Sequence, residues 1–289
     1  MEKRIDGATQ LICLIGSPVK HSGSPLMHNF AFRHNNQNFA YLCFDVKEED
    51  TAKAMDMLRF LGARGCNATM PCKVATAKCV DKLSPAAEII GACNTVVNDN
   101  GVLTGHITDG AGMVYCLRDN GVEVKDKKIV CIGAGGAATA VEVEVALQGA
   151  RALSIFNRTV EKAEANVAKI KAAVPDCDVK AFPIADKDAL REEIAGADIL
   201  INATSIGMAP NVEDTPIEDA GVFHPGLVVA DAVYNPMETR LIREAKEAGC
   251  QVVTGDGMLL WQGAVGYELW TGAKFPIEEF RAFKAGLQD

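Results

Sequence analysis

The sequence has no apolar run long enough to cross a membrane. A membrane-spanning helix needs about 20 consecutive apolar residues, and the most apolar stretches, at 199–203 and 227–232, are far shorter. The first ten residues are charged and do not contain the apolar segment of a secretory signal. We therefore expect a cytoplasmic protein without a transmembrane helix.

An excess of basic residues is also missing. The chain has 29 Lys and Arg against 38 Asp and Glu, which gives a formal net charge of −9. Nucleic acids and anionic membranes bind clustered Lys and Arg, so we expect neither as a partner. An anionic substrate then has to meet local hydrogen-bond donors or a local basic group.

The ten cysteines do not have the spacing of a metal site or of a disulfide framework. Four of them, Cys66, Cys72, Cys79 and Cys93, lie close in the sequence but do not form C-x-x-C pairs, and no histidine pair lies nearby. We expect most cysteines to be small core residues, and we expect no metal.

An alternation of strands and helices is what the sequence does contain. The length of 289 residues favours two domains, and we place a boundary near Asp109. Before it, we expect a helix that starts with Ser24 as N-cap, and an Asn100-Gly101 hairpin turn. The further strands are expected at 11–15, 39–46, just before Thr69, 128–132, 152–156, 179–182, 199–202 and 228–232, and helices at 25–34, 48–61, 109–120, 136–147, 161–173 and from about Gly257 and Pro276. This order predicts an α/β fold with a parallel sheet covered by helices on both faces.

A glycine motif follows the strand at 128–132 and opens a helix. The residues are Gly133, Ala134, Gly135, Gly136 and Ala137, followed by Ala138, and they match G-x-G-x-x-G/A in the required context. Glycines permit a tight turn and a close approach to a pyrophosphate at the helix N-terminus. The motif predicts a dinucleotide site, and the alternative is a structural turn that binds nothing.

Basic residues stand where NAD-selective sites place an acid. The next strand ends in Asn157, Arg158 and Thr159, with Lys162 one helical step further. A guanidinium there can pair with a 2′-phosphate, so NADP is favoured and NAD stays possible. The alternative is that Arg158 is only a solvated residue at a helix start.

Two groups of polar residues follow strands in the N-terminal half. Ser22 and Ser24 lie at a helix N-terminus and suit a carboxylate, although Ser24 taken alone is explained better by helix capping. Thr69 and Lys73 follow the third strand, and Asp109 follows a turn. A lysine steadied by a carboxylate can exchange the proton of an alcohol during hydride transfer. The alternative is a surface ion pair without a chemical role.

The chain resembles the shikimate/quinate dehydrogenase family across almost its whole length. The motifs that carry the resemblance, in order, are Ser22-x-Ser24-Pro25, Asn67-x-Thr69-x-Pro71-x-Lys73, Gly91-Ala92-Cys93-Asn94-Thr95, Thr108-Asp109-Gly110, the glycine motif, Asn157-Arg158-Thr159, Asn202-Ala203-Thr204-Ser205, Val233-Tyr234-Asn235-Pro236 and Gly257 through Gln262. The motifs around Trp261 and Trp270 are more similar to the quinate/shikimate branch.

The resemblance implies a substrate domain at 1–109 that is completed by C-terminal helices at 256–289, and a Rossmann-like doubly wound NAD(P) domain at 110–255. It implies shikimate or quinate as substrate, with Lys73 as the catalytic acid/base beside Asp109. Substrate contacts are implied for Ser22, Ser24, Thr69, Asn94, Tyr234 and Gln262. Cofactor contacts are implied for the glycine motif, Asn157, Arg158, Thr159, Lys162, Ala232 and Gly255, with the loop at 202–208 beside the nicotinamide.

Two departures from the family pattern leave alternatives open. Ile107 stands where the family usually has Asn, which puts the recognition of a ring hydroxyl in question. The acid that often accepts the NAD ribose in the quinate branch is replaced by Thr159-Val160-Glu161-Lys162. The rivals are an enzyme for an altered ring acid and a catalytically silent NAD(P)-binding regulator. The sequence leaves open whether Lys73 or Asp109 holds the proton, and whether the protein is a monomer or a homodimer.

Overall fold

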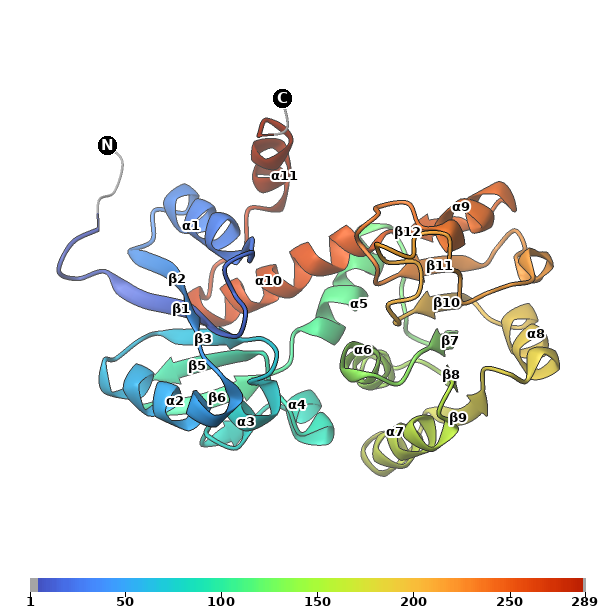
Figure 1. Ribbon diagram of the computed structural model, residues 1–289, viewed down its shortest axis with the longest axis horizontal. Helices are drawn as coiled ribbons and strands as arrows, with labels where there is room; N and C mark the ends of the chain where they lie inside the picture. Colours follow the sequence, from blue (N-terminus) through green and yellow to red (C-terminus); the bar gives the residue numbers. More distant parts are fainter. Residues whose placement is uncertain (1–4, 288–289) are drawn as a thin grey trace. The chain divides into compact units, whose positions relative to one another are not determined.

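The computed structural model describes residues 5–287, and it divides into two compact units (Figure 1). One unit comprises the chain up to Thr108 together with the chain from Gly263 onward, and the other comprises Asp109–Gln262. Within the described residues, no helix is both long and apolar enough to span a membrane.

The first unit contains a six-stranded sheet in the order β2-β1-β3-β5-β6-β4. The strands β1 (Gln10–Gly16), β2 (Phe39–Asp45) and β3 (Gly65–Ala68) are parallel, as expected from their apolar runs. Strands β5 (Thr95–Asp99) and β6 (Val102–His106) form an antiparallel hairpin, and β4 is Lys82–Leu83. Asn100 and Gly101 have φ of 55° and 93°, the left-handed conformation that a two-residue hairpin turn requires. The predicted hairpin is confirmed.

The helices of the first unit begin with α1 (Ser24–His34) and end with α11 (Ile277–Ala285). The others are α2 (Thr51–Phe60), α3 (Lys73–Ala77), α4 (Pro85–Ile90) and the part of α10 (Gly255–Thr271) from Gly263 onward. The predicted N-cap at Ser24 is wrong, because Gly23 is the N-cap and Ser24 is already helical. The cap makes no side-chain hydrogen bond.

The C-terminal segment completes the core of the first unit. Trp270 is 2% exposed, and its Nε1 donates a hydrogen bond of 2.9 Å to the carbonyl oxygen of Val96 on β5. A Cβ at Gly65 would lie 2.7 Å from that indole nitrogen, so the strand has to carry glycine there. The Arg64 Nε also donates to the Trp270 carbonyl oxygen at 2.7 Å. The helix α10 therefore packs directly on the sheet through a close backbone approach.

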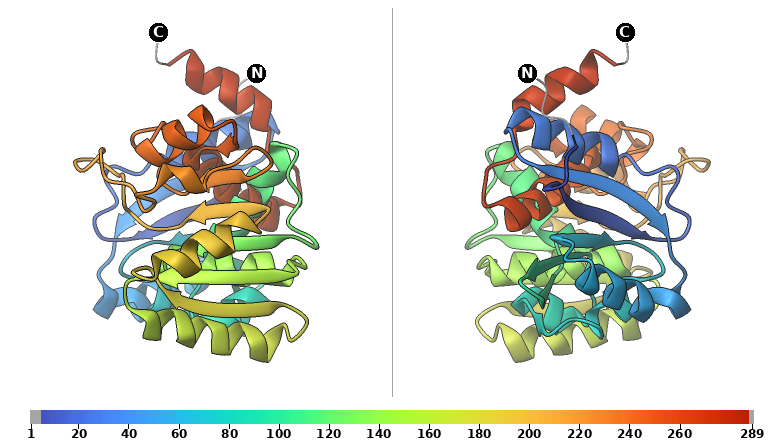
Figure 2. Two further views of the ribbon diagram at one scale, coloured as in Figure 1. Left: turned by 90° about the vertical axis from the view of Figure 1, so that its right-hand side faces the viewer. Right: turned by 90° about the vertical axis from the view of Figure 1, so that its left-hand side faces the viewer.

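The second unit is a doubly wound parallel sheet in the order β12-β11-β10-β7-β8-β9 (Figure 1; left view of Figure 2). Counted along the chain, this is the 3-2-1-4-5-6 order of the Rossmann fold. The strands are β7 (Lys128–Ile132), β8 (Ala152–Asn157), β9 (Asp178–Pro183), β10 (Ile199–Asn202), β11 (Val228–Asp231) and β12 (Gln251–Val253). The helices are α5 (Asp109–Asp119), α6 (Gly136–Leu147), α7 (Val160–Ala173), α8 (Lys187–Ala195) and α9 (Arg240–Glu247), with α10 up to Gln262.

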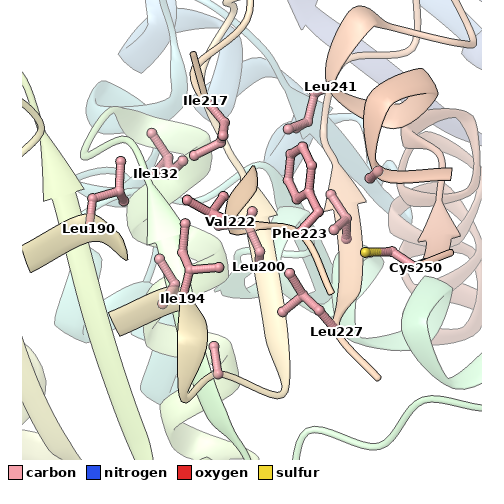
Figure 3. Packing of buried hydrophobic residues seen from close by; sticks show 14 of the residues in the cluster. Ile132, Leu190, Ile194, Leu200, Ile217, Val222, Phe223, Leu227, Leu241 and Cys250 are labelled. Carbon is pink, nitrogen blue, oxygen red and sulfur yellow. The ribbon is translucent and has the colours of Figure 1, made fainter. Parts of the chain in front are cut away.

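A buried cluster joins the strands of this sheet to α8 and α9 (Figure 3). Ile132 and Leu200 come from the central strands, Ile194 from α8 and Leu241 from α9. The sequence pattern predicted the strands around this cluster but not α8, α9 or β12. Eight of the ten cysteines are buried, including Cys131 in β7, so most of them are core residues as predicted.

Candidate active site

The glycine loop lies at the carboxyl end of β7, where the strand order reverses. Gly133 has φ of 120°, and a Cβ there would lie 3.0 Å from the Thr204 Cγ2 and 3.1 Å from the Ala203 carbonyl oxygen. The loop after β7 is thus packed against the loop after β10, whose Ala203 N–H donates to the Ile132 carbonyl oxygen at 2.9 Å. Open α/β sheets bind their ligands at such a reversal.

The next two glycines are not explained by the fold. A Cβ at Gly135 or Gly136 would meet no atom within 4 Å, and neither residue has a left-handed φ. Gly135 is the N-cap of α6, and no described side chain caps that helix. Gly135, Gly136 and Ala137 are exposed, whereas Ala134 is buried. A structural turn accounts for Gly133, but the open space and the uncapped N–H groups at Gly135 and Gly136 fit the pyrophosphate of a dinucleotide.

The end of β8 presents two exposed cations. Arg158 precedes the N-cap of α7, and Lys162 lies in its first turn. Within residues 5–287, neither side chain has a carboxylate at ion-pair distance. Asn157 anchors the turn, because its Nδ2 donates to the Thr159 carbonyl oxygen at 2.8 Å. Both a 2′-phosphate site and a solvated Arg158 are compatible with this geometry.

A buried carboxyl shapes the loops after β10 and β11. Asp231 is 1% exposed, and it accepts hydrogen bonds from the Thr239 Oγ1 at 2.6 Å, the Val233 N–H at 2.9 Å and the Asn202 Nδ2 at 2.9 Å. Burial raises the pKa of Asp231, and these hydrogen bonds oppose the shift. The Asn202 Oδ1 in turn accepts from the Thr204 Oγ1 at 2.7 Å. Asp231 therefore fixes the beginning of both loops.

Asp231 and Thr239 are not among the site residues predicted from the sequence. The available signal was a carboxylate that ends an otherwise apolar strand, Val228–Asp231. The structure does bring together two residues that were predicted to line the cofactor, since a Cβ at Gly255 would lie 2.8 Å from the carbonyl carbon of Ala232. Gly255 is the first residue of α10.

Three more residues that were predicted to bind the substrate or to take part in catalysis lie in the second unit. Tyr234 is 51% exposed on the turn after β11. Gln262 is half-buried on α10, and its Nε2 donates to the Leu259 carbonyl oxygen at 3.2 Å. Asp109 is the first residue of α5, where the helix dipole favours a carboxylate.

In the first unit, the loop after β1 that carries Ser22 lies beside the loop that follows β3. Ser22 and Ser24 are half-buried, and the Ser24 N–H donates to the Ser22 Oγ at 3.2 Å. Because Ser24 does not cap α1, capping does not explain its hydroxyl. The Ser17 N–H donates to the Met70 carbonyl oxygen at 3.0 Å, which joins the two loops at the carboxyl ends of β1 and β3.

Thr69 and Lys73 flank the short loop that leads into α3. The Thr69 N–H donates to the Ile15 carbonyl oxygen at 2.9 Å, and Lys73 is the first residue of the helix. The Lys73 carbonyl oxygen accepts the Cys93 N–H at 3.1 Å. The structure thus brings the backbone of Lys73 next to the segment that carries Asn94.

Asn94 ties this segment to the end of the first unit. It is 4% exposed, and its Oδ1 accepts the Thr108 N–H at 2.8 Å and the Thr95 Oγ1 at 3.2 Å. The Asn94 Oδ1 is thus engaged by hydrogen bonds within the first unit. Asp109 follows Thr108 directly, and the preceding Ile107 is buried.

A second polar network under these loops was not predicted. The Tyr41 hydroxyl donates to the Asn67 Oδ1 at 2.6 Å, and the Asn67 Nδ2 donates to the Thr95 Oγ1 at 3.0 Å. All three residues are buried. The sequence signal was an Asn inside strand β3, a position that the strand pattern assigns to the core.

Comparisons with known proteins agree along the chain. Residues 14–96 match the family described as "Shikimate dehydrogenase substrate binding domain", residues 117–220 match "Shikimate / quinate 5-dehydrogenase", and residues 255–282 match "Shikimate 5'-dehydrogenase C-terminal domain". The chain is 46% identical over 279 residues to the shikimate dehydrogenase (NADP(+)) of Listeria monocytogenes serotype 4b (strain F2365), covering 96% of each protein. It is 41% identical to the quinate/shikimate dehydrogenase of Escherichia coli O17:K52:H18, covering 93% of this chain and 94% of that protein.

A solved structure of shikimate 5-dehydrogenase from Listeria monocytogenes, in complex with shikimate and NAD, superposes with a TM-score of 0.95. The two chains are 45% identical, with 98% of this chain and 99% of that chain covered. Together with the Rossmann strand order and the uncapped glycine loop, this defines an NAD(P)-dependent oxidoreductase that acts on a CH–OH group. The chain belongs to the shikimate/quinate dehydrogenase family.

Proposed function

We propose that this protein is a shikimate dehydrogenase that reversibly reduces 3-dehydroshikimate to shikimate with NADP, in the biosynthesis of aromatic amino acids through chorismate. The observation that supports it most is the 46% identity to an NADP-dependent shikimate dehydrogenase over 96% of both chains. The exposed Arg158 and Lys162, which have no ion-pair partner among the described residues, supply the positive charge that a 2′-phosphate needs.

The residues of the first unit are proposed to hold the substrate. Ser22 and Ser24 would bind the carboxylate with their hydroxyls, and Thr69 and Asn94 would bind ring hydroxyls. This arrangement needs no basic patch, in keeping with the net charge of −9. Tyr234 and Gln262 are proposed as further substrate contacts.

Lys73 is proposed as the acid/base of the reaction. Nicotinamide, when bound, accepts or supplies the hydride. Lys73 takes the hydroxyl proton as the alcohol is oxidised and returns it as the ketone is reduced. Asp109 is proposed to orient the lysine.

The cofactor is proposed to bind along the carboxyl edge of the second sheet. Its pyrophosphate would meet Gly133, Ala134, Gly135, Gly136 and Ala137 at the start of α6. Its adenosine end would meet Asn157, Arg158, Thr159 and Lys162, and its nicotinamide end would meet Ala232 and Gly255. The proposed domains are a substrate domain at 1–109 and 256–289 and a cofactor domain at 110–255.

The alternative is a quinate/shikimate dehydrogenase that uses NAD or both cofactors. It is favoured by the 41% identity to the quinate/shikimate dehydrogenase of Escherichia coli. We further propose that the enzyme is cytoplasmic and that it is a monomer or a homodimer. The cytoplasmic location is supported by the ten cysteines, which are all free thiols, as a reducing compartment requires.

Initial rates of absorbance change at 340 nm, with shikimate and quinate each paired with NADP and NAD, test the proposal. Shikimate with NADP should give the highest kcat/KM. Quinate with NAD as the best pair would replace the proposal by the alternative. A protein that binds NADP but turns over neither acid would be a silent regulator or an enzyme for another ring acid.

Lys73→Ala tests the proton-transfer role. We expect kcat to fall by about 10²-fold or more, while the Kd of NADP stays near that of the wild type. Lys78→Ala, which removes an exposed lysine at the other end of α3, is the matched control. Wild-type turnover by Lys73→Ala would remove Lys73 from the mechanism.

A further inference from the structure

A carboxyl group is buried behind the glycine loop of the second unit. Glu142 on α6 is 0% exposed, and burial raises its pKa from 4.5 to about 8, against the hydrogen bonds from Asn166 and the Cys131 thiol. Its Oε1 has no oxygen or nitrogen partner among the described residues. The side chain is therefore a neutral acid near pH 7, and the proposed reaction assigns it no function.

Hydrogen bonds connect this carboxyl group to the glycine loop. The Asn166 Nδ2 on α7 donates to the Glu142 Oε2 at 2.8 Å and to the Thr139 Oγ1 at 2.9 Å. The Thr139 Oγ1 is 2.9 Å from the Gly135 carbonyl oxygen. An amide nitrogen only donates and a carbonyl only accepts, so Thr139 has to accept from Asn166 and donate to Gly135.

The Gly135 carbonyl is part of the peptide that opens the helix. A trans peptide is planar, and its C=O and N–H groups point in opposite directions. Holding the Gly135 oxygen therefore also fixes the direction of the Gly136 N–H. That N–H stands at the exposed, uncapped start of α6, where the loop has open space for a ligand.

We propose that Thr139, Asn166 and Glu142 are positioning residues that hold the Gly135–Gly136 peptide in the orientation that binds the cofactor pyrophosphate. This rests on the proposed function only in taking NADP as the ligand. The bond from the Thr139 hydroxyl to the Gly135 carbonyl oxygen is one that helices also make for purely structural reasons, and the Thr139 N–H donates to the same oxygen at 2.8 Å. The two roles differ in what they change, which is NADP affinity in one case and helix stability in the other.

The proposal includes a dependence on pH. The groups that face the Glu142 carboxyl are the Asn166 amide on α7, which does not titrate, and the Cys131 thiol on β7, whose own pKa burial raises far above its usual range. As the pH passes about 8, Glu142 becomes a carboxylate and draws the Asn166 amide toward itself. The Asn166–Thr139 bond then weakens, and NADP binding weakens with it.

Direct measurement of the NADP Kd in the full-length protein, by calorimetry or by cofactor fluorescence, tests the positioning role. Thr139→Val should weaken NADP binding roughly fivefold, the effect of one lost hydrogen bond, and leave the KM of shikimate unchanged. Thr139→Ser keeps the hydroxyl and should restore the affinity. Ser154→Ala is the control, because this buried hydroxyl on β8 bonds Glu193 at 2.7 Å and not the loop.

A wild-type Kd in Thr139→Val with a lowered melting temperature would overturn the proposal and leave a structural bond. The second test is Glu142→Gln, which keeps an oxygen acceptor for Asn166 but does not titrate. Its NADP Kd should not change between about pH 7 and about pH 9, whereas that of the wild type should rise. Parallel pH profiles for the two proteins would contradict the role of Glu142. Because the readout is NADP binding, a wild type without turnover would count against the proposed function alone.

Discussion

The buried Glu142 carboxyl makes a quantitative prediction about stability, because its protonation differs between the folded and the unfolded chain. The folded chain holds the proton up to about pH 8, whereas the ordinary pKa of the free side chain is 4.5. Below pH 4.5 both states are protonated, and the side chain favours neither. Above it the unfolded state ionises first, so the free energy of unfolding falls by about 1.4 kcal/mol per pH unit.

The free energy of unfolding is therefore highest below the pKa of the unfolded chain. Its fall is complete once the pH has passed the pKa of the folded chain. The full loss is roughly 5 kcal/mol, the difference between the two pKa values multiplied by about 1.4 kcal/mol. Glu142→Gln removes the titration. The variant should therefore gain stability relative to the wild type as the pH rises from about 5 to about 8, with no further gain at higher pH.

Urea unfolding of both proteins across this pH range, followed by circular dichroism, measures the difference. Glu164→Gln is the control, since that carboxyl lies exposed on α7 and is solvated in both states. The stability difference between this control and the wild type should stay constant with pH. A constant difference for Glu142→Gln as well would refute the reasoning, because it would mean that the Glu142 carboxyl is not held neutral in the folded protein.

Four further substitutions separate binding from folding. Arg158→Leu should raise the KM of NADP about tenfold and leave that of NAD unchanged, because only NADP offers the charged partner; equal losses in steady-state assays would contradict this. Gly135→Ala should keep the wild-type melting temperature and weaken NADP binding about tenfold or more. Gly133→Ala should lower both the melting temperature and the affinity for NADP, since only Gly133 needs its left-handed φ. Trp270→Ala should destabilise the first unit by about 3–5 kcal/mol in denaturant unfolding, and a smaller loss would mean that the indole is not tightly packed.

The sequence predicted the elements whose signals are local. Strand β7 and helix α6 were predicted at the observed residues, because an apolar run ends at glycines and a helix-forming run follows. The helices α8 and α9 were missed because both are short and highly charged, and their burial depends on contacts made across the sheet. The Ser24 cap was wrong because capping depends on the backbone of Gly23, which a residue pattern does not specify.

The candidate site shows the same limit. The glycine loop and the cations after β8 are contiguous in sequence, so a motif is enough to find them. The Asp231 network joins the ends of two strands and the start of α9, and the Thr139–Asn166–Glu142 chain joins two helices. Such pairings arise only when the sheet assembles, so a single sequence without the fold does not reveal them.

Because Trp270 packs on Val96, the first unit can be completed only after Trp270 has been synthesised. The ribosome makes the strands of the first unit before any part of the second, yet the indole that covers those strands emerges only after the whole of the second unit. The second unit, Asp109–Gln262, is contiguous and has all its residues available earlier. The unit that is begun first is therefore finished last, and until then its sheet lacks the side chains of α10 that bury it.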